Sequence, residues 1–200
     1  MLLLQKIPPM NVAIFASGNG TNAQRIIEYF SGNPQIKIAL VLSNKQDAFV
    51  LQRAQRLNVP TFCFTSAELK NTSIVQDKLK EYKIDFIVLA GFMIMVPDSL
   101  IEFYRDRVIN IHPALLPKYG GKGMFGNHVH ESVIEAKEKE SGISIHYVNE
   151  KYDEGAIIFQ AKCAITPTDT PETLATRIHQ LEHKYYPEII EKVIKEKFFK

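Results

Sequence analysis

Two polar residues stand at the end of an apolar run, VINIHPALLP, that begins at residue 108. Asn110 and His112 are two positions apart, so on a strand both side chains project from one face. A carboxamide can hold a developing oxyanion and an imidazole can move a proton, which suits attack on a carbonyl carbon. The alternative is a structural pair that satisfies backbone groups beside Pro113. The carboxyl end of a strand is where open α/β sheets bind ligands, and this favours the chemical interpretation.

A histidine that moves protons needs a partner that sets its pKa, and Asp153 is the best candidate. It lies in the short segment 152–155, between two predicted strands. A nearby carboxylate favours the charged imidazolium. The sequence alone does not place Asp153 beside His112, and several other acidic residues could serve. No serine or cysteine occupies a nucleophile elbow, so no covalent route is indicated.

The remaining histidines give little support for metal chemistry. His128, His130 and Glu131 form one cluster, and His179 and His183 form a second at i, i+4 spacing. Neither cluster has a convincing third ligand, so we predict no metal site.

A glycine-rich turn, SGNGTN at residues 17–22, follows the first apolar run and precedes a helical pattern. Glycines let backbone N–H groups approach a ligand, and a helix N-terminus attracts an anion. The turn lacks the third glycine of a dinucleotide fingerprint and the Gly-Lys-Ser/Thr of a P-loop. It suits a phosphate monoester, and a plain tight turn without ligand is the alternative.

These residues must be positioned by strands that alternate with helices. Apolar runs predict seven strands, at residues 11–16, 36–43, 60–64, 85–90, 107–111, 141–149 and 156–164. Helical spacing predicts helices at 21–30, 47–57, 66–82 and 98–104, and a last helix that begins at Pro171 with Thr170 as its N-cap. The pattern indicates an α/β, Rossmann-like, mostly parallel sheet of about seven strands, with helices on both faces and an antiparallel C-terminal hairpin.

Composition sets the wider class. The 200 residues are 46% hydrophobic with a net charge of +2, which is typical of one globular domain and gives no nucleic-acid footprint. The N-terminus MLLLQKIPP is too short for a signal peptide, and no run is long enough to span a membrane. The two cysteines are expected to be free thiols. We therefore expect a soluble cytoplasmic protein; the oligomeric state stays open, a homodimer included.

Five segments together carry a resemblance to one family. They read ASGNGTN from residue 16, VLSNKQDAF from 41, VLAGFM from 88, INIHPALLPKY from 109 and EHKYYP from 182. The sequence closely resembles the phosphoribosylglycinamide formyltransferases, the folate-dependent enzymes of purine synthesis, over essentially its whole length. The resemblance implies a single formyltransferase domain over residues 1–200.

The resemblance also implies an activity. The amine of glycinamide ribonucleotide (GAR) would attack the formyl group of 10-formyltetrahydrofolate, without a metal. Asn110, His112 and Asp153 match the family's catalytic residues, with Asp153 keeping the histidine charged. GAR would be bound by Gly20, Thr21, Asn22, Lys118 and Glu182. Folate would be bound by Asn110 together with Lys70, Met93, Ile94, Met95 and Val96.

The sequence departs from the family at several positions. Ile94 stands where arginine is common, and His179 stands where glutamine is common. The family's basic residue on the helix before the strand at 85–90 has no clean counterpart, and Lys70 is the nearest candidate for it. Residues 120–127 form a distinct glycine-rich loop. Two other functions stay open: an anion-binding module without chemistry, and hydrolysis of the formyl group to formate.

Overall fold

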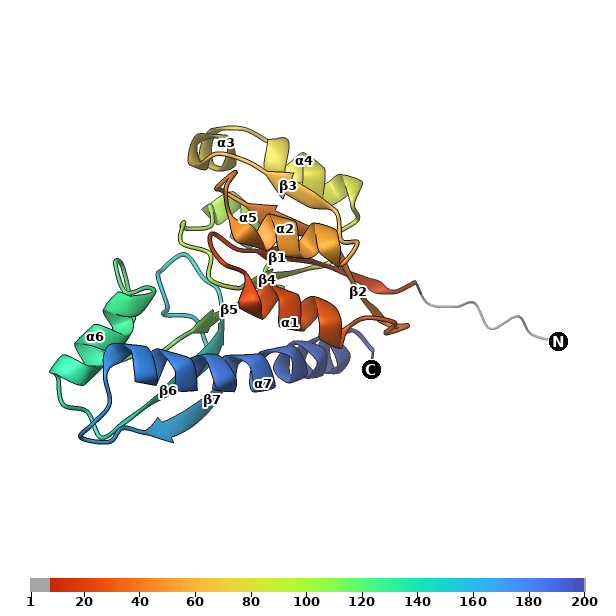
Figure 1. Cartoon of the computed structure of the whole chain (residues 1–200). Coiled ribbons are helices and arrows are strands. Elements are labelled where there is room, and N and C mark those ends of the chain that lie inside the picture. The colour runs from red at the N-terminus through yellow and green to blue at the C-terminus, as the bar shows by residue number, and fades with distance from the viewer. Residues whose placement is uncertain (1–7, 200) are drawn as a thin grey trace.

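The computed structural model describes residues 8–199, and its strands form one seven-stranded sheet (Figure 1). The strand order is β3-β2-β1-β4-β5-β6-β7. The prediction about the first seven residues of the N-terminus lies outside the described part. The strands are β1 (Met10–Phe15), β2 (Ile36–Ser43), β3 (Thr61–Cys63), β4 (Phe86–Leu89), β5 (Val108–His112), β6 (Glu140–Tyr147) and β7 (Ile157–Ala164).

The first five strands pair in parallel, and β6 and β7 complete the sheet with antiparallel pairings. The predicted mixed sheet with an antiparallel C-terminal hairpin is confirmed. Because the chain runs outward from β1 to β2 on one side and later to β4 on the other, the switch in strand order lies between β1 and β4. The carboxyl ends of these strands therefore open into a crevice, where ligands of such sheets bind.

Helices cover both faces of the sheet. One apolar core lies under α1 (Thr21–Tyr29), α2 (Phe49–Arg56), α6 (Asn127–Glu135) and α7 (Pro171–Phe198). The second core lies under α3 (Ser66–Asn71), α4 (Ile74–Glu81) and α5 (Asp98–Phe103). β1 shows why both faces must be covered, since Val12 and Ile14 enter the first core while Ala13 and Phe15 enter the second.

Two helical predictions differ from the structure. The single helix expected at 66–82 is two helices, because the backbone of Thr72 is extended and ends α3. The Thr65–Glu68 capping box starts α3 separately. α6 was not predicted, because the glycine-rich segment before it indicated a continuing loop. Thr170 caps α7 as predicted, its side chain accepting a hydrogen bond from the N–H of Thr173.

Within residues 8–199, no helix combines the length and apolar character that crossing a bilayer requires.

Candidate active site

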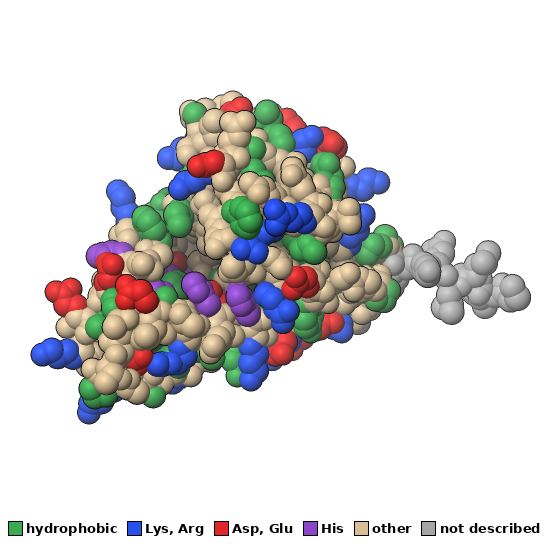
Figure 2. Space-filling view, viewed as in Figure 1, with side chains coloured by type: hydrophobic (Ala, Val, Ile, Leu, Met, Phe, Trp, Pro, Cys, Tyr) green, Lys and Arg blue, Asp and Glu red, His purple; other side chains and the backbone are tan. Residues whose placement is uncertain are grey.

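A cavity of about 550 Å³ opens at the carboxyl ends of β1, β4 and β5. Figure 2 shows a hollow in this face of the molecule with histidine side chains around it. The glycine loop 18–22 forms one wall, and residues 89–96 form an apolar wall. The ends of β5 and β6, the loop 121–127, segment 148–153 and α7 complete the lining.

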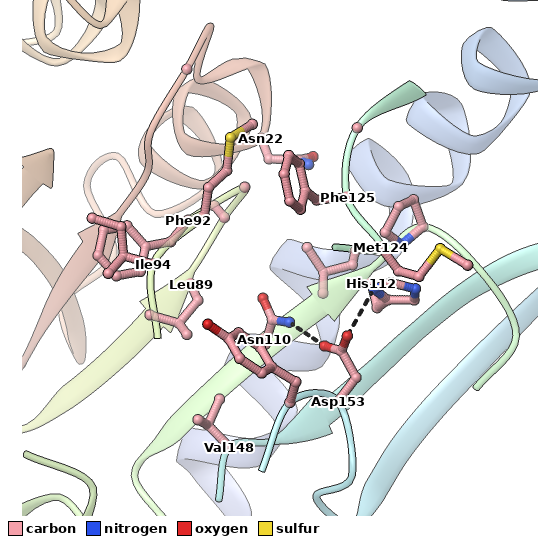
Figure 3. Close-up of a pocket in the computed structure, with 18 of the residues that line it drawn as sticks. Asn22, Leu89, Phe92, Ile94, Asn110, His112, Met124, Phe125, Val148 and Asp153 are labelled. Atoms are coloured by element: carbon pink, nitrogen blue, oxygen red, sulfur yellow. Dashed lines mark hydrogen bonds and ion pairs between the residues drawn. The ribbon is translucent and has the colours of Figure 1, made fainter. Parts of the chain in front are cut away.

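Asn110, His112 and Asp153 converge in this cavity (Figure 3). His112 Nδ1 lies 3.6 Å from Asp153 Oδ2, and Asn110 Nδ2 lies 3.5 Å from Asp153 Oδ1. The N–H of Gly121 donates to Asp153 Oδ2 at 2.9 Å and holds the carboxylate in place. Asp153 itself has a φ of 55°, a left-handed backbone conformation in the turn between β6 and β7.

His112 is almost fully buried at 3% exposure, and both of its ring nitrogens face oxygen atoms. Nε2 lies 2.7 Å from the carbonyl oxygen of Tyr119, so this nitrogen carries a hydrogen. Burial lowers the pKa of His112, while the Asp153 carboxylate and the Tyr119 carbonyl act in the opposite direction. The net shift is opposite to the one expected from sequence, because burial outweighs the carboxylate in the ligand-free protein.

Asp153 carries its charge at neutral pH. Burial raises the pKa of Asp153, but its contact with His146 and the proximity of His112 outweigh burial and hold that pKa below its ordinary value. A carboxylate therefore stands ready beside a histidine that lacks its second proton, which is an arrangement for accepting and returning one proton.

His146 is a fourth polar residue of the site, and sequence reasoning missed it. It pairs directly with Asn110 across β5 and β6. Its Nδ1 lies 2.8 Å from the Tyr147 carbonyl oxygen and must donate, so Nε2 accepts from Asn110 Nδ2 at 3.2 Å. The bond fixes the orientation of the Asn110 carboxamide. The same i, i+2 rule that singled out Asn110 would have found it, because Ser144 and His146 are polar residues on one face of a buried strand.

The glycine loop ends at α1 with free backbone donors. Gly20 is the N-cap residue with a φ of 76°, and no side chain caps the helix. The first N–H groups of α1 therefore point toward the cavity without a side-chain partner, as an anion site requires.

Asn22 and Glu182 join the glycine loop to α7. Asn22 Nδ2 donates to Glu182 Oε2 at 2.8 Å, and Asn22 Oδ1 is buried with no partner in the described part of the chain. Glu182 is 5% exposed, and burial raises its pKa against the opposing hydrogen bond from Asn22. This end of the cavity thus offers one unused acceptor and a carboxyl group on adjacent elements.

Most of the sequence matches a known family. A family model described as formyl transferase matches residues 10–190. The chain belongs to the formyl transferase family.

Named relatives of this formyl transferase include bacterial and plant proteins. A phosphoribosylglycinamide formyltransferase of Haemophilus influenzae is 38% identical over 184 residues, covering 90% of this chain and 84% of that protein. A chloroplastic phosphoribosylglycinamide formyltransferase of Arabidopsis thaliana is 38% identical over 192 residues, and the aligned region covers 93% of this chain and 66% of the plant protein. The crystal structure of the Bacillus halodurans phosphoribosylglycinamide formyltransferase superposes with a TM-score of 0.83 at 38% identity, covering 93% of this chain and 96% of that one.

Most residues predicted for the site line the cavity of this formyl transferase, including Met93, Ile94, Met95 and Val96. Lys118 does not line it, because its exposed ammonium group pairs with Glu138 Oε1 at 2.8 Å. Lys70 does not line it either, since it is an exposed residue in the last turn of α3. Across residues 8–199, no group of three or more His, Cys, Asp or Glu side chains is arranged to hold a metal ion.

Replacing Gly20 with alanine is expected to lower the free energy of unfolding by about 2–4 kcal/mol. A positive φ costs an alanine about 1 kcal/mol, and overpacking adds about 1–3 kcal/mol. An added Cβ would lie 2.4 Å from Val50 Cβ. Gly32→Ala is the matched control, since Gly32 has a φ of 77° and open space around it. Urea denaturation of both variants measures the difference, and equal losses would exclude close packing as the cause.

The stability of the fold should depend on His130 at acidic pH. His130 is 3% exposed on α6, its Nδ1 has no partner in the described part of the chain, and burial lowers its pKa to about 4. The unfolded chain binds this proton near pH 6.5 and the folded protein only near pH 4, so stability falls as pH drops between these values. From pH 7 to pH 5 we expect His130 to contribute a loss of about 2 kcal/mol.

Urea denaturation at both pH values measures this effect. His130→Gln should remove that part of the pH dependence, whereas His128→Gln, at an exposed position on the same helix, should keep it. An unchanged pH dependence in His130→Gln would contradict the assignment.

Proposed function

We propose that the chain transfers the formyl group of 10-formyltetrahydrofolate to the amine of GAR, in de novo purine biosynthesis. The observation that carries the proposal is one cavity that holds Asn110, His112 and Asp153 and is bounded by a free helix N-terminus. The family match and the named relatives support the same reaction. We further propose that residues 1–200 act as one formyltransferase domain, in the cytoplasm.

The glycine loop is proposed to bind the 5′-phosphate of GAR. Gly20, Thr21 and Asn22 line the cavity where α1 begins, so their N–H groups and the positive end of the helix dipole face the anion. Glu182 lies beside Asn22 and would accept hydrogen bonds from the ribose hydroxyls or the amine. Lys118 is left out of this binding set because it lies away from the cavity.

The apolar wall is proposed to bind the folate. Met93, Ile94, Met95 and Val96 line it from the segment after β4, and Leu89 and Val148 continue it toward Asn110 (Figure 3). A flat heteroaromatic ring loses little by leaving water for such a surface, and nearby backbone groups can satisfy its polar edge. Lys70 has no part in this pocket.

The reaction proceeds by direct attack. The neutral amine of GAR forms a bond to the formyl carbon, and the carbonyl oxygen becomes an oxyanion in a tetrahedral intermediate. An N–H of Asn110 donates to this oxyanion, and the positive charge of a protonated His112 close by stabilises it further. The N–H that faces Asp153 at 3.5 Å is available for this purpose, since the bond to His146 is the shorter one.

Proton transfer completes the exchange. The nitrogen of the attacking amine loses a proton, and N10 of the folate gains one as its bond to the formyl carbon breaks. His112 lies against Asp153, whose carboxylate stabilises the imidazolium. The imidazolium can deliver its proton to N10 and then take up the proton that the amine loses, which restores its charge. The products are formyl-GAR and tetrahydrofolate.

An assay of the purified protein with both substrates tests the proposal. We expect formyl-GAR to form and tetrahydrofolate to accumulate in equal amounts, and to continue forming in the presence of EDTA. Release of formate without GAR would instead indicate a hydrolase. Binding of GAR with neither product would indicate an anion-binding module.

A further inference from the structure

The side chain of Arg53 reaches from α2 to the back of the glycine loop. Its Nε donates to the carbonyl oxygen of Asn19 at 2.8 Å, and its Nη2 donates to Asn19 Oδ1 at 2.8 Å. Its Nη1 donates to Oε1 of Gln24, in the first turn of α1. One planar guanidinium therefore ties the loop to the helix whose free N–H groups face the cavity.

The first turn of α2 also packs against the glycine loop. The N–H of Val50 donates to the carbonyl oxygen of Gly18 at 3.1 Å, and the Val50 side chain fills the space next to Gly20. α2 lies beside α1 in Figure 1. The shape of the loop thus depends on contacts with α2 as well as on its own glycines.

Arg53 also brings charge to the loop from outside the cavity. It is half-buried, lies outside the cavity lining, and forms no ion pair with a carboxylate within residues 8–199. Its guanidinium stacks on the ring of Phe49, 4.7 Å from the ring centroid, which fixes the side chain in its reach toward Asn19. The positive charge is therefore held close to the predicted phosphate position and is not neutralised by a neighbouring acid.

We propose that Arg53 is a positioning residue for the phosphate of the acceptor substrate. It holds Asn19 and the first turn of α1 in the geometry that presents the loop's N–H groups, without touching the substrate itself. The inference rests on the proposed function, because it takes the glycine loop to be the phosphate site. It predicts that loss of Arg53 weakens binding of the phosphorylated substrate and leaves binding of the folate unaffected.

Steady-state kinetics of three variants test this role. In Arg53→Ala we expect KM for GAR to rise about tenfold or more, the scale of losing hydrogen bonds to a charged group. KM for 10-formyltetrahydrofolate and kcat should stay within about twofold of the wild type. Arg53→Lys should recover only part of the loss, because an ammonium group cannot reproduce the two-pronged contact with Asn19.

Arg56→Ala is the matched control. Arg56 lies on the same helix and on the same Phe49 ring, 5.6 Å from its centroid, and none of the described hydrogen bonds joins it to the loop. Arg56→Ala removes the same charge from the same helix without removing a contact to the loop. Its KM for GAR should therefore equal that of the wild type. A normal KM in Arg53→Ala would overturn the proposal, as would equal changes in both KM values.

Inorganic phosphate separates this inference from the proposed reaction. Phosphate should raise the melting temperature of the wild type and of Arg56→Ala but not of Arg53→Ala, and this readout needs no turnover. Equal stabilisation of all three, or of none, would overturn the role of Arg53. A wild type that transfers no formyl group would reject the proposed function instead.

Discussion

Replacing His112 with alanine is expected to lower kcat for formyl transfer by at least about two orders of magnitude, the scale of lost acid–base catalysis. The imidazole lies against Asp153 and lines the cavity, and a water molecule in its place would have no group that exchanges protons near neutral pH. KM for both substrates should change little, because His112 acts on the reacting atoms. Initial rates at saturating substrate measure the effect.

Asn110→Ala should cause a loss of similar size, since it removes the donor proposed for the oxyanion. His128→Ala is the control for both, because His128 is an exposed histidine that lies outside the cavity. Circular dichroism establishes that each variant is folded. Near-native turnover in both His112→Ala and Asn110→Ala would show that the catalytic assignment is wrong.

Asp153→Asn is expected to retain substrate binding and to lose rate by about two orders of magnitude or more. Asparagine keeps the size of the side chain and still accepts the hydrogen bond from the Gly121 N–H, so the local structure should survive. It removes the carboxylate that acts against burial at His112, so the pKa of His112 falls further. Fewer molecules then hold the imidazolium that the transition state requires.

The pH dependence of kcat gives this prediction a second measurement. If protonated His112 is needed, the limb of the profile that falls with rising pH should move to lower pH in Asp153→Asn. Glu154→Gln is the control, because Glu154 is the neighbouring carboxylate and is exposed. Retained rate with weakened GAR binding would instead make Asp153 a binding residue.

The sequence was most informative where function follows from local spacing. Asn110 and His112 share one strand face, and the glycine loop adjoins its own helix, so neighbouring residues alone were enough to single out both. The order of the seven strands followed from apolar runs for the same reason, whereas α6 and the division of the helix at 66–82 did not. His146 was within reach of this reasoning, because it too is a polar residue in a buried strand.

The remaining features depend on contacts between distant segments. Asp153 lies 41 positions after His112, and it reaches the histidine because β6 pairs antiparallel with β5 and the turn after β6 carries Asp153 to the cavity. Lys118 follows β5 closely, yet its ammonium group pairs with Glu138, which comes after α6. The position of Glu138 after α6 could not be predicted while α6 itself was unrecognised.

The register of the sheet limits the distance between the phosphate and the nucleophile of the proposed acceptor. Phe15, Leu89 and Asn110 lie side by side on β1, β4 and β5. Adjacent strands are about 4.8 Å apart, so the turn after β1, which we propose binds the phosphate, and the carboxamide on β5 are offset laterally by roughly 10 Å. If the proposed phosphate site is correct, the acceptor has to span that gap between its phosphate and its nucleophile. A pentose fits between them, whereas a phosphorylated amine with a two-carbon spacer would be too short to engage both ends at once.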